Sequence, residues 1–255
     1  MTPNPILAAI RAGKTVVAMW MELGSPDLAE AAVHRGWTAL VVDNEHGVSS
    51  LDKAVELHRA ARSAGGEVIL RVPAADPVHL KLVMDRGFRC IMAPMINTAD
   101  EAREFVAACR YPPRGRRGYA APVVRASGYG ANADYRRNSH EDILLIAQIE
   151  HHEAVDKIPE IAAVDGIDML FIGPNDLAGS IGRLEELDHP DVLALAQTAE
   201  DAILASGKWL GSIPRPGRTA ADLHTRGCRL IVGPSDIGFF LSGASATHAD
   251  YPFKA

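Results

Sequence analysis

The feature that most constrains the fold is a repeat of short apolar runs, each followed by a segment with helical character. Most of the runs are nearly continuous in hydrophobic residues, which is typical of parallel strands covered on both faces. The eight runs occupy residues 15–22, 38–45, 67–72, 90–95, 144–150, 169–174, 209–214 and 230–236. Eight strand–helix units in 255 residues predict a single (β/α)8 TIM barrel that spans residues 1–255.

The segments between the runs carry helix start and stop signals. Ser25 followed by Pro26 is a typical N-cap and first helical residue. An arginine precedes glycine at residues 35–36, 86–87 and 226–227, where arginine suits the helix C-terminus and glycine the left-handed cap. A doubly wound open sheet is the alternative, but it would bind a nucleotide through a Gly-rich first turn, and no GxGxxG follows an early strand.

The composition narrows the functional class. The chain is 47% hydrophobic and 23% charged, and its net charge of −6 argues against nucleic acid or an anionic membrane as the main partner. It has neither a run of about 20 apolar residues nor the pattern of a signal peptide. Its three cysteines form no CxxC pair and no even set for disulfides. We therefore expect a cytoplasmic protein with reduced thiols.

A long segment at about residues 110–140 interrupts the repeat between the fourth and fifth strands. It is rich in Gly, Pro, Arg and Tyr. One interpretation is a solvated surface loop. The other, which we favour because long loops in compact domains are usually functional, is a loop that covers the active-site mouth or reaches a neighbouring subunit.

Polar residues gather where the apolar runs end. In a TIM barrel, the catalytic groups lie at these C-terminal ends of the strands. An arginine at the end of the third run needs an anionic partner, because an unpaired guanidinium beside a barrel core would be costly. The polar strand-end residues are Trp20, Glu22, Asp43, Glu45, His46, Arg71, Gln148, Glu150, Asp176 and Asp236.

Glu150 and Asp176 follow consecutive strands and suggest a metal site. Two carboxylates at neighbouring strand ends would repel each other unless a cation lies between them. A donor set of oxygens suits Mg²⁺ or Mn²⁺ with open positions for water and substrate, with Co²⁺ and Zn²⁺ as alternatives. Each residue could instead cap a helix or lie in a loop, and His151 or His152 could add a third ligand.

His46 is the candidate general base. A lone loop histidine is often simply solvated, but Asp43 lies three positions earlier and could orient the imidazole. A carboxylate–imidazole pair of this kind makes a base that works near neutral pH.

Six motifs in unbroken order resemble the HpcH/HpaI aldolase family, near its 4-hydroxy-2-oxoheptanedioate and 2-keto-3-deoxyglucarate aldolases. They are "VVDNEHG", "LRVPAADP", "DRGFRCIMAPMINTADEA", "RYPPRGRRG", "AQIE" and "FIGPNDLAGSIG", and the resemblance covers about residues 5–245. It implies a barrel, usually hexameric, in which a divalent metal binds pyruvate as its enolate, often in aromatic compound catabolism.

The resemblance also implies roles for individual residues. Glu150 and Asp176 match the family's metal ligands, and His46 with Asp43 matches its catalytic dyad. Arg71 matches the active-site arginine, and Gln148 matches a glutamine that contacts the substrate or a metal-bound water. Asp85 matches an aspartate near the subunit interface. Further substrate contacts are expected at Trp20, Gly173, Asn175 and Asp176. Asn44 before "EH", "GVSS" after it and "SIPRPG" at the seventh strand depart from the family pattern, which affects the expected aldehyde specificity.

The lysines decide between two ways of stabilising an enolate. Aldolases use either a lysine Schiff base or a metal ion. No lysine ends a strand: they are Lys14, Lys53, Lys81, Lys157, Lys208 and Lys254. The metal route remains. In it, Arg71 stabilises the enolate oxygen, the amides of Asn175 and Asp176 hold the carboxylate, and His46 with Asp43 takes the C4 hydroxyl proton.

We therefore expect a class II aldolase. It would cleave 4-hydroxy-2-oxo acids to pyruvate, or a close analogue such as hydroxypyruvate, and an aldehyde, through a metal-bound enolate. One alternative is a CoA-ester lyase of the citrate-lyase β or malyl-CoA type, whose nucleotide the arginines of residues 114–137 would hold. The other is a non-catalytic keto-acid-binding protein.

Overall fold

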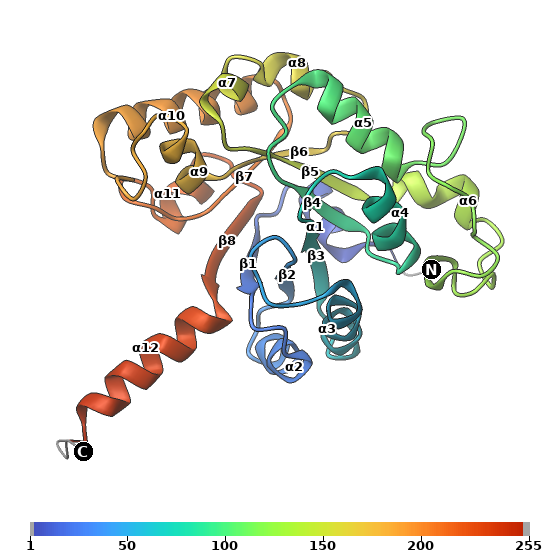
Figure 1. Ribbon diagram of the computed structural model, residues 1–255, viewed down its shortest axis with the longest axis horizontal. Helices are drawn as coiled ribbons and strands as arrows, with labels where there is room; N and C mark the ends of the chain where they lie inside the picture. The colour runs from blue at the N-terminus through green and yellow to red at the C-terminus, as the bar shows by residue number, and fades with distance from the viewer. Residues whose placement is uncertain (1–2, 252–255) are drawn as a thin grey trace.

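Figure 1 shows the protein as a computed structural model, which describes residues 3–251. Eight parallel strands pair in sequence order and close into a barrel. Each lies within one of the apolar runs, so the predicted (β/α)8 barrel is confirmed. The strands are β1 (Val16–Met21), β2 (Ala39–Asp43), β3 (Glu67–Arg71), β4 (Cys90–Ala93), β5 (Leu144–Ile149), β6 (Met169–Ile172), β7 (Trp209–Ser212) and β8 (Leu230–Ser235).

The helices surround the barrel and begin where the sequence predicts. Ser25 caps α2 by accepting a hydrogen bond from the Leu28 amide at 3.3 Å, and Gly36 and Gly87 take the left-handed conformation after their helices. The helices are α1 (Pro5–Arg11), α2 (Pro26–His34), α3 (Leu51–Ser63), α4 (Pro77–Asp85), α5 (Ala99–Cys109), α6 (Tyr135–Asn138), α7 (His152–Val155), α8 (Ile158–Ala162), α9 (Pro174–Gly179), α10 (Pro190–Ala205), α11 (Ala220–Thr225) and α12 (Asp236–Ala249), with 3-10 turns at Arg125–Ser127 and Ser139–Glu141.

Alternation along the strands separates two apolar cores. One set of side chains, including Val41, Ile69 and Phe171, fills the barrel interior. The residues between them, such as Leu40 and Leu70, pack against the surrounding helices. Successive side chains on a strand face opposite sides, so this alternation decides which residues beyond the strand ends face the barrel axis.

The long segment between α5 and β5 lies at the N-terminal end of the barrel. Asp142 accepts hydrogen bonds from the Asn4 amide and from Arg89, both at 2.7 Å, and Arg125 donates to the Arg86 carbonyl at 2.6 Å. Arg89 precedes β4, Arg86 follows α4, and Asn4 caps α1 beside the start of β4, so all three partners lie away from the catalytic rim. The interpretation of this loop as a cover for the mouth of its own barrel is therefore wrong, because a connection from a helix to the next strand lies at the opposite end. Its reach to a neighbouring subunit stays a prediction.

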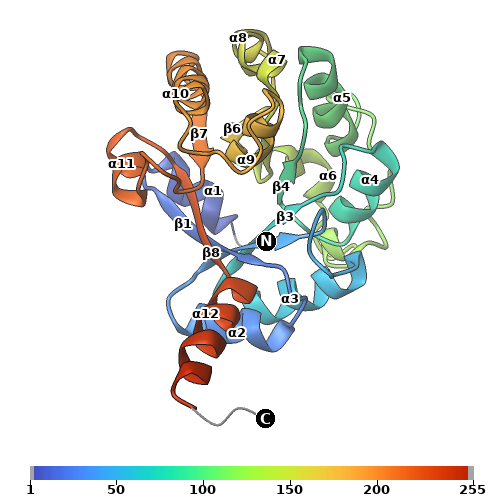
Figure 2. The ribbon, with the colours of Figure 1, turned by 60° about the vertical axis from the view of Figure 1, so that its left-hand side comes forward.

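The last helix leaves the barrel. Figures 1 and 2 show α12 extending away from the strands, with its far end clear of the other elements. Only Asp236 of this helix is buried, and the side chains of Phe239, Phe240 and Leu241 are all more than half exposed. Within residues 3–251, no helix has both the length and the apolar character needed to cross a membrane.

Candidate active site

The polar strand-end side chains converge because they continue the inward-facing pattern of the barrel. On β1, Ala18 and Trp20 belong to the interior core, so Glu22 also faces inward. The same alternation along the other strands places five further inward-facing residues at the C-terminal rim: Asp43, Arg71, Gln148, Glu150 and Gly173.

Arg71 is held by carboxylates of the second strand and its loop. Its Nε and Nη2 donate to the two oxygens of Asp43 at 2.9 and 2.6 Å, and its Nη1 lies 3.2 Å from an oxygen of Glu45. The guanidinium carbon also lies 4.5 Å from the centre of the Trp20 ring, a cation–π contact. The anionic partner that Arg71 needed thus comes from the protein itself.

The carboxylate of Asp43 is fully buried, and Arg71 keeps it ionised. Burial alone would raise its pKa, but the hydrogen bonds and charge of Arg71, with the amides of Glu45 and His46, lower the pKa instead. Glu45 differs, because burial outweighs the attraction of Arg71 and raises its pKa.

The structure gives Asp43 a partner other than the predicted one. Its Oδ1 accepts a hydrogen bond from the backbone N–H of His46 at 3.3 Å, while the imidazole lies nearest to Glu45, with 3.9 Å between Nε2 and Oε2. The His46 side chain is 67% exposed. Asp43 thus fixes the side chain of Arg71 and the backbone at His46, and it does not hold the imidazole ring.

Glu150 is buried at the end of β5 and is held by two donors. Its Oε1 accepts a hydrogen bond from the Met95 amide at 2.7 Å, and its Oε2 accepts one from the Gln148 side chain at 2.8 Å. Met95 takes a left-handed backbone with φ of 53°, which is uncommon outside glycine. A Cβ on Gly173 would lie only 2.4 Å from the Glu150 Oε2, so a side chain here would displace the carboxylate from its present position.

The charge of Glu150 is only partly compensated. Burial raises its pKa to about 7, the Met95 amide opposes this, and the nearby carboxylates of Glu45 and Asp176 raise it further. Gln148, which is 1% exposed, uses its amide nitrogen on Glu150, and its Oε1 has no hydrogen-bond partner among residues 3–251. A buried oxygen acceptor without a donor points to a group that the protein itself does not supply.

These donors fit a hard cation. Residues 3–251 contain no cluster of three or more His, Cys, Asp or Glu side chains arranged around one metal position. They do place two carboxylates, Glu150 and the exposed Asp176, within electrostatic range of each other beside the free Gln148 oxygen. Few protein ligands and all-oxygen donors suit an ion that keeps positions for water and substrate.

The other predicted residues are distributed as follows. Asn175 is exposed in the first turn of α9, next to Asp176. Asp85 lies at the opposite end of the barrel, where it forms an ion pair with Arg117 of the long segment at 2.6 Å. Sequence reasoning missed Met95, because a backbone donor leaves no side-chain signal, and assigned no role to Glu22, although its place after an inward-facing strand position was visible.

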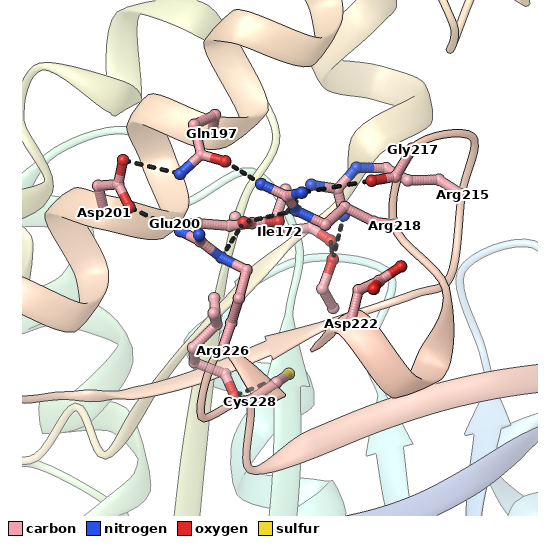
Figure 3. Close-up of polar contacts among 12 residues, drawn as sticks. Ile172, Gln197, Glu200, Asp201, Arg215, Gly217, Arg218, Asp222, Arg226 and Cys228 are labelled. Carbon is pink, nitrogen blue, oxygen red and sulfur yellow. Dashed lines mark hydrogen bonds and ion pairs between the residues drawn. The ribbon is translucent and has the colours of Figure 1, made fainter. Parts of the chain in front are cut away.

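A second charged cluster lies outside the barrel, between α10 and the ends of β7 and α11 (Figure 3). The fully buried Glu200 pairs with three arginines, Arg215, Arg218 and Arg226. Arg215 also donates to the Ser212 hydroxyl at 3.2 Å. The sequence "SIPRPG" at the seventh strand, which departs from the family pattern, thus contributes to an ion-pair network that attaches the β7–α11 loop to α10.

Comparison with known proteins is consistent with this geometry. The model of the family described as HpcH/HpaI aldolase/citrate lyase matches residues 16–213. The chain belongs to this family. It is accordingly a carbon–carbon lyase of the aldolase type, and the family and enzyme class predicted from the sequence are confirmed.

Individual relatives of this HpcH/HpaI family chain cover most of its length. It is 38% identical over 242 residues to a 4-hydroxy-2-oxovalerate aldolase of Novosphingobium aromaticivorans, covering 94% of this chain and 92% of the relative. It is 38% identical over 208 residues to a hydroxypyruvate/pyruvate aldolase of Agrobacterium fabrum, covering 82% and 78%. A crystal structure of a family protein from Burkholderia cenocepacia matches with a TM-score of 0.90 and 32% identity, covering 97% of this chain and 98% of that one.

Proposed function

We propose that this aldolase cleaves 4-hydroxy-2-oxo acids to an aldehyde and pyruvate, or a close analogue such as hydroxypyruvate, with the help of a divalent metal ion. The observation that carries the proposal is the buried Glu150, whose raised pKa and proximity to Asp176 leave negative charge in need of a cation. The names of the relatives, which include pyruvate and hydroxyketoacid aldolases, support the substrate class.

Glu150 and Asp176 would hold the ion. Mg²⁺ or Mn²⁺ suits their oxygens, with Co²⁺ and Zn²⁺ as alternatives. When bound, the ion would supply the positive charge that polarises the 2-oxo group of the substrate. The free oxygen of Gln148 can accept a hydrogen bond from a water or hydroxyl beside this position.

Arg71 would stabilise the enolate oxygen as negative charge develops during cleavage. Its orientation is fixed before substrate arrives, because Asp43 binds it through two hydrogen bonds and Trp20 lies against its guanidinium face. A preorganised cation of this kind stabilises a transition state without reorganising at the moment of reaction. The lone inward arginine at the rim thus has an electrostatic role, and Asp43 is its positioning residue.

Substrate contacts would come from the loop after β6. The amides of Asn175 and Asp176 open a helix, so they have no acceptor within it and can donate to the substrate carboxylate. Gly173 lets the backbone pass close to Glu150. His46 would take the C4 hydroxyl proton, and its exposed ring beside Glu45 is free to move toward a substrate that enters from solvent.

A homo-oligomer, with a hexamer as the expected state, is the second part of this proposal. A helix that exposes Phe239, Phe240 and Leu241 while leaving its own barrel would expose a large apolar face in a monomer. An apolar groove lies at its base, lined by Phe239 and Phe240 of α12 itself, by Leu23 of the loop after β1 and by residues of α2 such as Leu28. We infer that a second copy covers these surfaces, and Asp85 would lie near a further contact between subunits.

The three cysteines support a cytoplasmic location for the enzyme. Cys90, Cys109 and Cys228 are all buried and unpaired. Burial raises the pKa of the Cys109 and Cys228 thiols to about 12. Thiols of this kind persist where the surroundings are reducing.

Release of pyruvate from a 4-hydroxy-2-oxo acid, followed with lactate dehydrogenase, tests the proposal. We expect turnover with Mg²⁺ or Mn²⁺ and its loss after treatment with EDTA. Cleavage of a CoA thioester in place of the keto acid would favour the CoA-ester lyase. The arginines of residues 114–137 belong to the segment at the N-terminal end of the barrel, away from Glu150, and so do not support that alternative.

A further inference from the structure

The catalytic rim has two halves, and the proposed function assigns the keto acid to one of them. Gln148 lies at the end of β5, Glu150 directly follows it, and Asp176 lies in the helix after β6. In the closed strand order, β1 and β2 lie on the other side of the barrel. With the keto acid held at β5 and β6, and with His46 after β2 taking the C4 hydroxyl proton, the departing aldehyde would extend over β8, β1 and β2.

Glu22 is the inward-facing carboxylate at the centre of this second half. Its backbone is fixed on both sides, since its N–H donates to the Asp236 Oδ1 at 2.9 Å and its carbonyl accepts from the Val48 amide at 3.0 Å. Its half-buried side chain contacts the Ser235 hydroxyl and lies within electrostatic range of two carboxylates, Asp43 and Asp236, and of the Arg71 guanidinium. No part of the proposed enolate chemistry uses this group.

The strand-end residues of this half supply no free permanent cation for a second anionic group. Among the inward-facing rim residues that the structure describes, Arg71 is the only arginine or lysine, and its guanidinium already binds Asp43 and Glu45. When ionised, the Glu22 carboxylate can accept a hydrogen bond from a hydroxyl group, and it repels another carboxylate. Arg215, in the loop after β7, is committed to Glu200.

We propose that Glu22 is a specificity-determining residue that selects neutral, hydroxyl-bearing aldehydes and disfavours aldehydes that carry a carboxylate. It accepts a hydrogen bond from a hydroxyl of the neutral aldehyde. It repels an anionic aldehyde, for which this half of the rim supplies no free permanent cation. The proposal rests on the proposed function, because it takes the keto acid to bind at β5 and β6.

The test compares the addition of pyruvate to glycolaldehyde and to glyoxylate, a two-carbon pair that differs in a hydroxymethyl or a carboxylate group. The quantity measured is the ratio of kcat/KM for the two aldehydes, with Mg²⁺ present. In Glu22→Gln we expect this ratio to shift toward glyoxylate by roughly tenfold, because the variant keeps the size and removes the charge. Glu22→Asp keeps the charge and should keep the wild-type preference.

Glu30→Gln is the matched control, because it removes the same charge from the exposed face of α2 and should leave the ratio unchanged. Circular dichroism checks that each variant is folded. A ratio in Glu22→Gln equal to that of the wild type would overturn the proposal. Exchange of the pyruvate methyl protons by the wild-type enzyme is measured separately. If the wild-type enzyme exchanges these protons, an unchanged ratio in Glu22→Gln overturns the role of Glu22 alone. If it does not exchange them, the proposed function fails and this proposal fails with it.

Discussion

The two charged clusters of this molecule have opposite balances of charge. Outside the barrel, one buried glutamate, Glu200, pairs with three arginines. At the rim, Arg71 is surrounded by several carboxylates, of which Asp43 and Glu45 pair with it and the buried Glu150 does not. A buried charge that is fully paired becomes costly only when its partner is removed, whereas one left without a cation already costs free energy and indicates a missing ligand.

The same substitution therefore has different consequences in the two places. Glu150→Gln and Glu200→Gln each remove one negative charge and keep the size of the side chain. If the comparison is right, the first should affect chemistry and the second should affect stability.

The largest expected effect is on the activity of Glu150→Gln. Replacing a metal-binding carboxylate by an amide should lower kcat for pyruvate release by about 10³-fold or more, since the metal supplies several kcal/mol of charge stabilisation. Titration with Mn²⁺, followed by electron paramagnetic resonance, should show that the variant has lost tight binding. Wild-type affinity for Mn²⁺ in this variant would place the metal elsewhere.

Glu200→Gln should destabilise the protein and leave its chemistry intact. The change leaves Arg215, whose side chain is 2% exposed, without its charged partner, and breaking a buried pair in this way costs about 3–5 kcal/mol. Denaturant unfolding measures the loss, and kcat per folded molecule should stay within about twofold of the wild type. A stable but inactive variant would join this cluster to the active site and remove the contrast.

Arg71→Met tests the positive charge at the rim. We expect kcat to fall by about 10²–10³-fold, the usual effect of removing one preorganised transition-state donor. Because the variant also leaves the buried Asp43 without its partner, thermal unfolding of the same sample is needed as a control. Full activity in a folded Arg71→Met protein would show that the charge has no role in the enolate step.

The pKa of Glu150 predicts how stability depends on pH in the metal-free protein. The folded pKa of about 7 lies above the ordinary value of 4.5, so between these values the folded state holds a proton that the unfolded state has lost. Stability due to this group therefore falls as pH rises through this window, by about 1.4 kcal/mol per pH unit. Glu150→Gln lacks this loss and should become more stable than the wild type by up to about 3 kcal/mol above pH 7.

Urea unfolding of both proteins in EDTA at pH 5.5 and pH 8 measures this difference. The Glu150→Gln variant serves to cancel the contributions of other buried groups, such as His58, whose pKa burial lowers. A constant difference between the two proteins across this range would contradict the assignment of the raised pKa to Glu150.

His46→Ala should have the smallest of these effects, and on activity alone. Removing a general base lowers rates by about 10²–10⁴-fold, and the exposed position of this ring suggests the lower end. Its side chain makes no buried contact, so the free energy of unfolding should stay within about 0.5 kcal/mol of the wild type. Asp43→Asn should resemble Arg71→Met more closely than His46→Ala, because Asp43 binds the arginine and not the imidazole.

The sequence predicted the parts of this structure that depend on local pattern. The eight apolar runs and the capping residues, such as Ser25 and Gly36, specify strands and helices by spacing and backbone preference alone. Polar residues where the apolar runs end also indicated the rim. The end of the barrel at which residues 110–140 lie could have been predicted too, because the segment follows a helix and precedes a strand.

The choice of partners within the site could not be predicted in this way. Asp43 lies close to His46 in sequence, but it is Arg71, 28 residues away, whose side chain donates hydrogen bonds to both carboxylate oxygens of Asp43. The Met95 amide that holds Glu150 depends on an uncommon backbone angle at a residue with no polar side chain. In the sequence, nothing distinguishes Glu200 from an ordinary helix residue, because its three arginine partners are brought to it only by the fold.

The central claim is that the excess of carboxylates at the rim holds a cation that promotes enolate formation. Proton NMR of pyruvate in D₂O tests this without knowledge of the aldehyde, because the enolate exchanges its methyl protons with solvent. The account predicts that the methyl signal decays with enzyme and Mg²⁺ or Mn²⁺, stops decaying in EDTA, and decays again when the metal is restored. Exchange that is equally fast in EDTA, or no exchange with any of these metals, would contradict it.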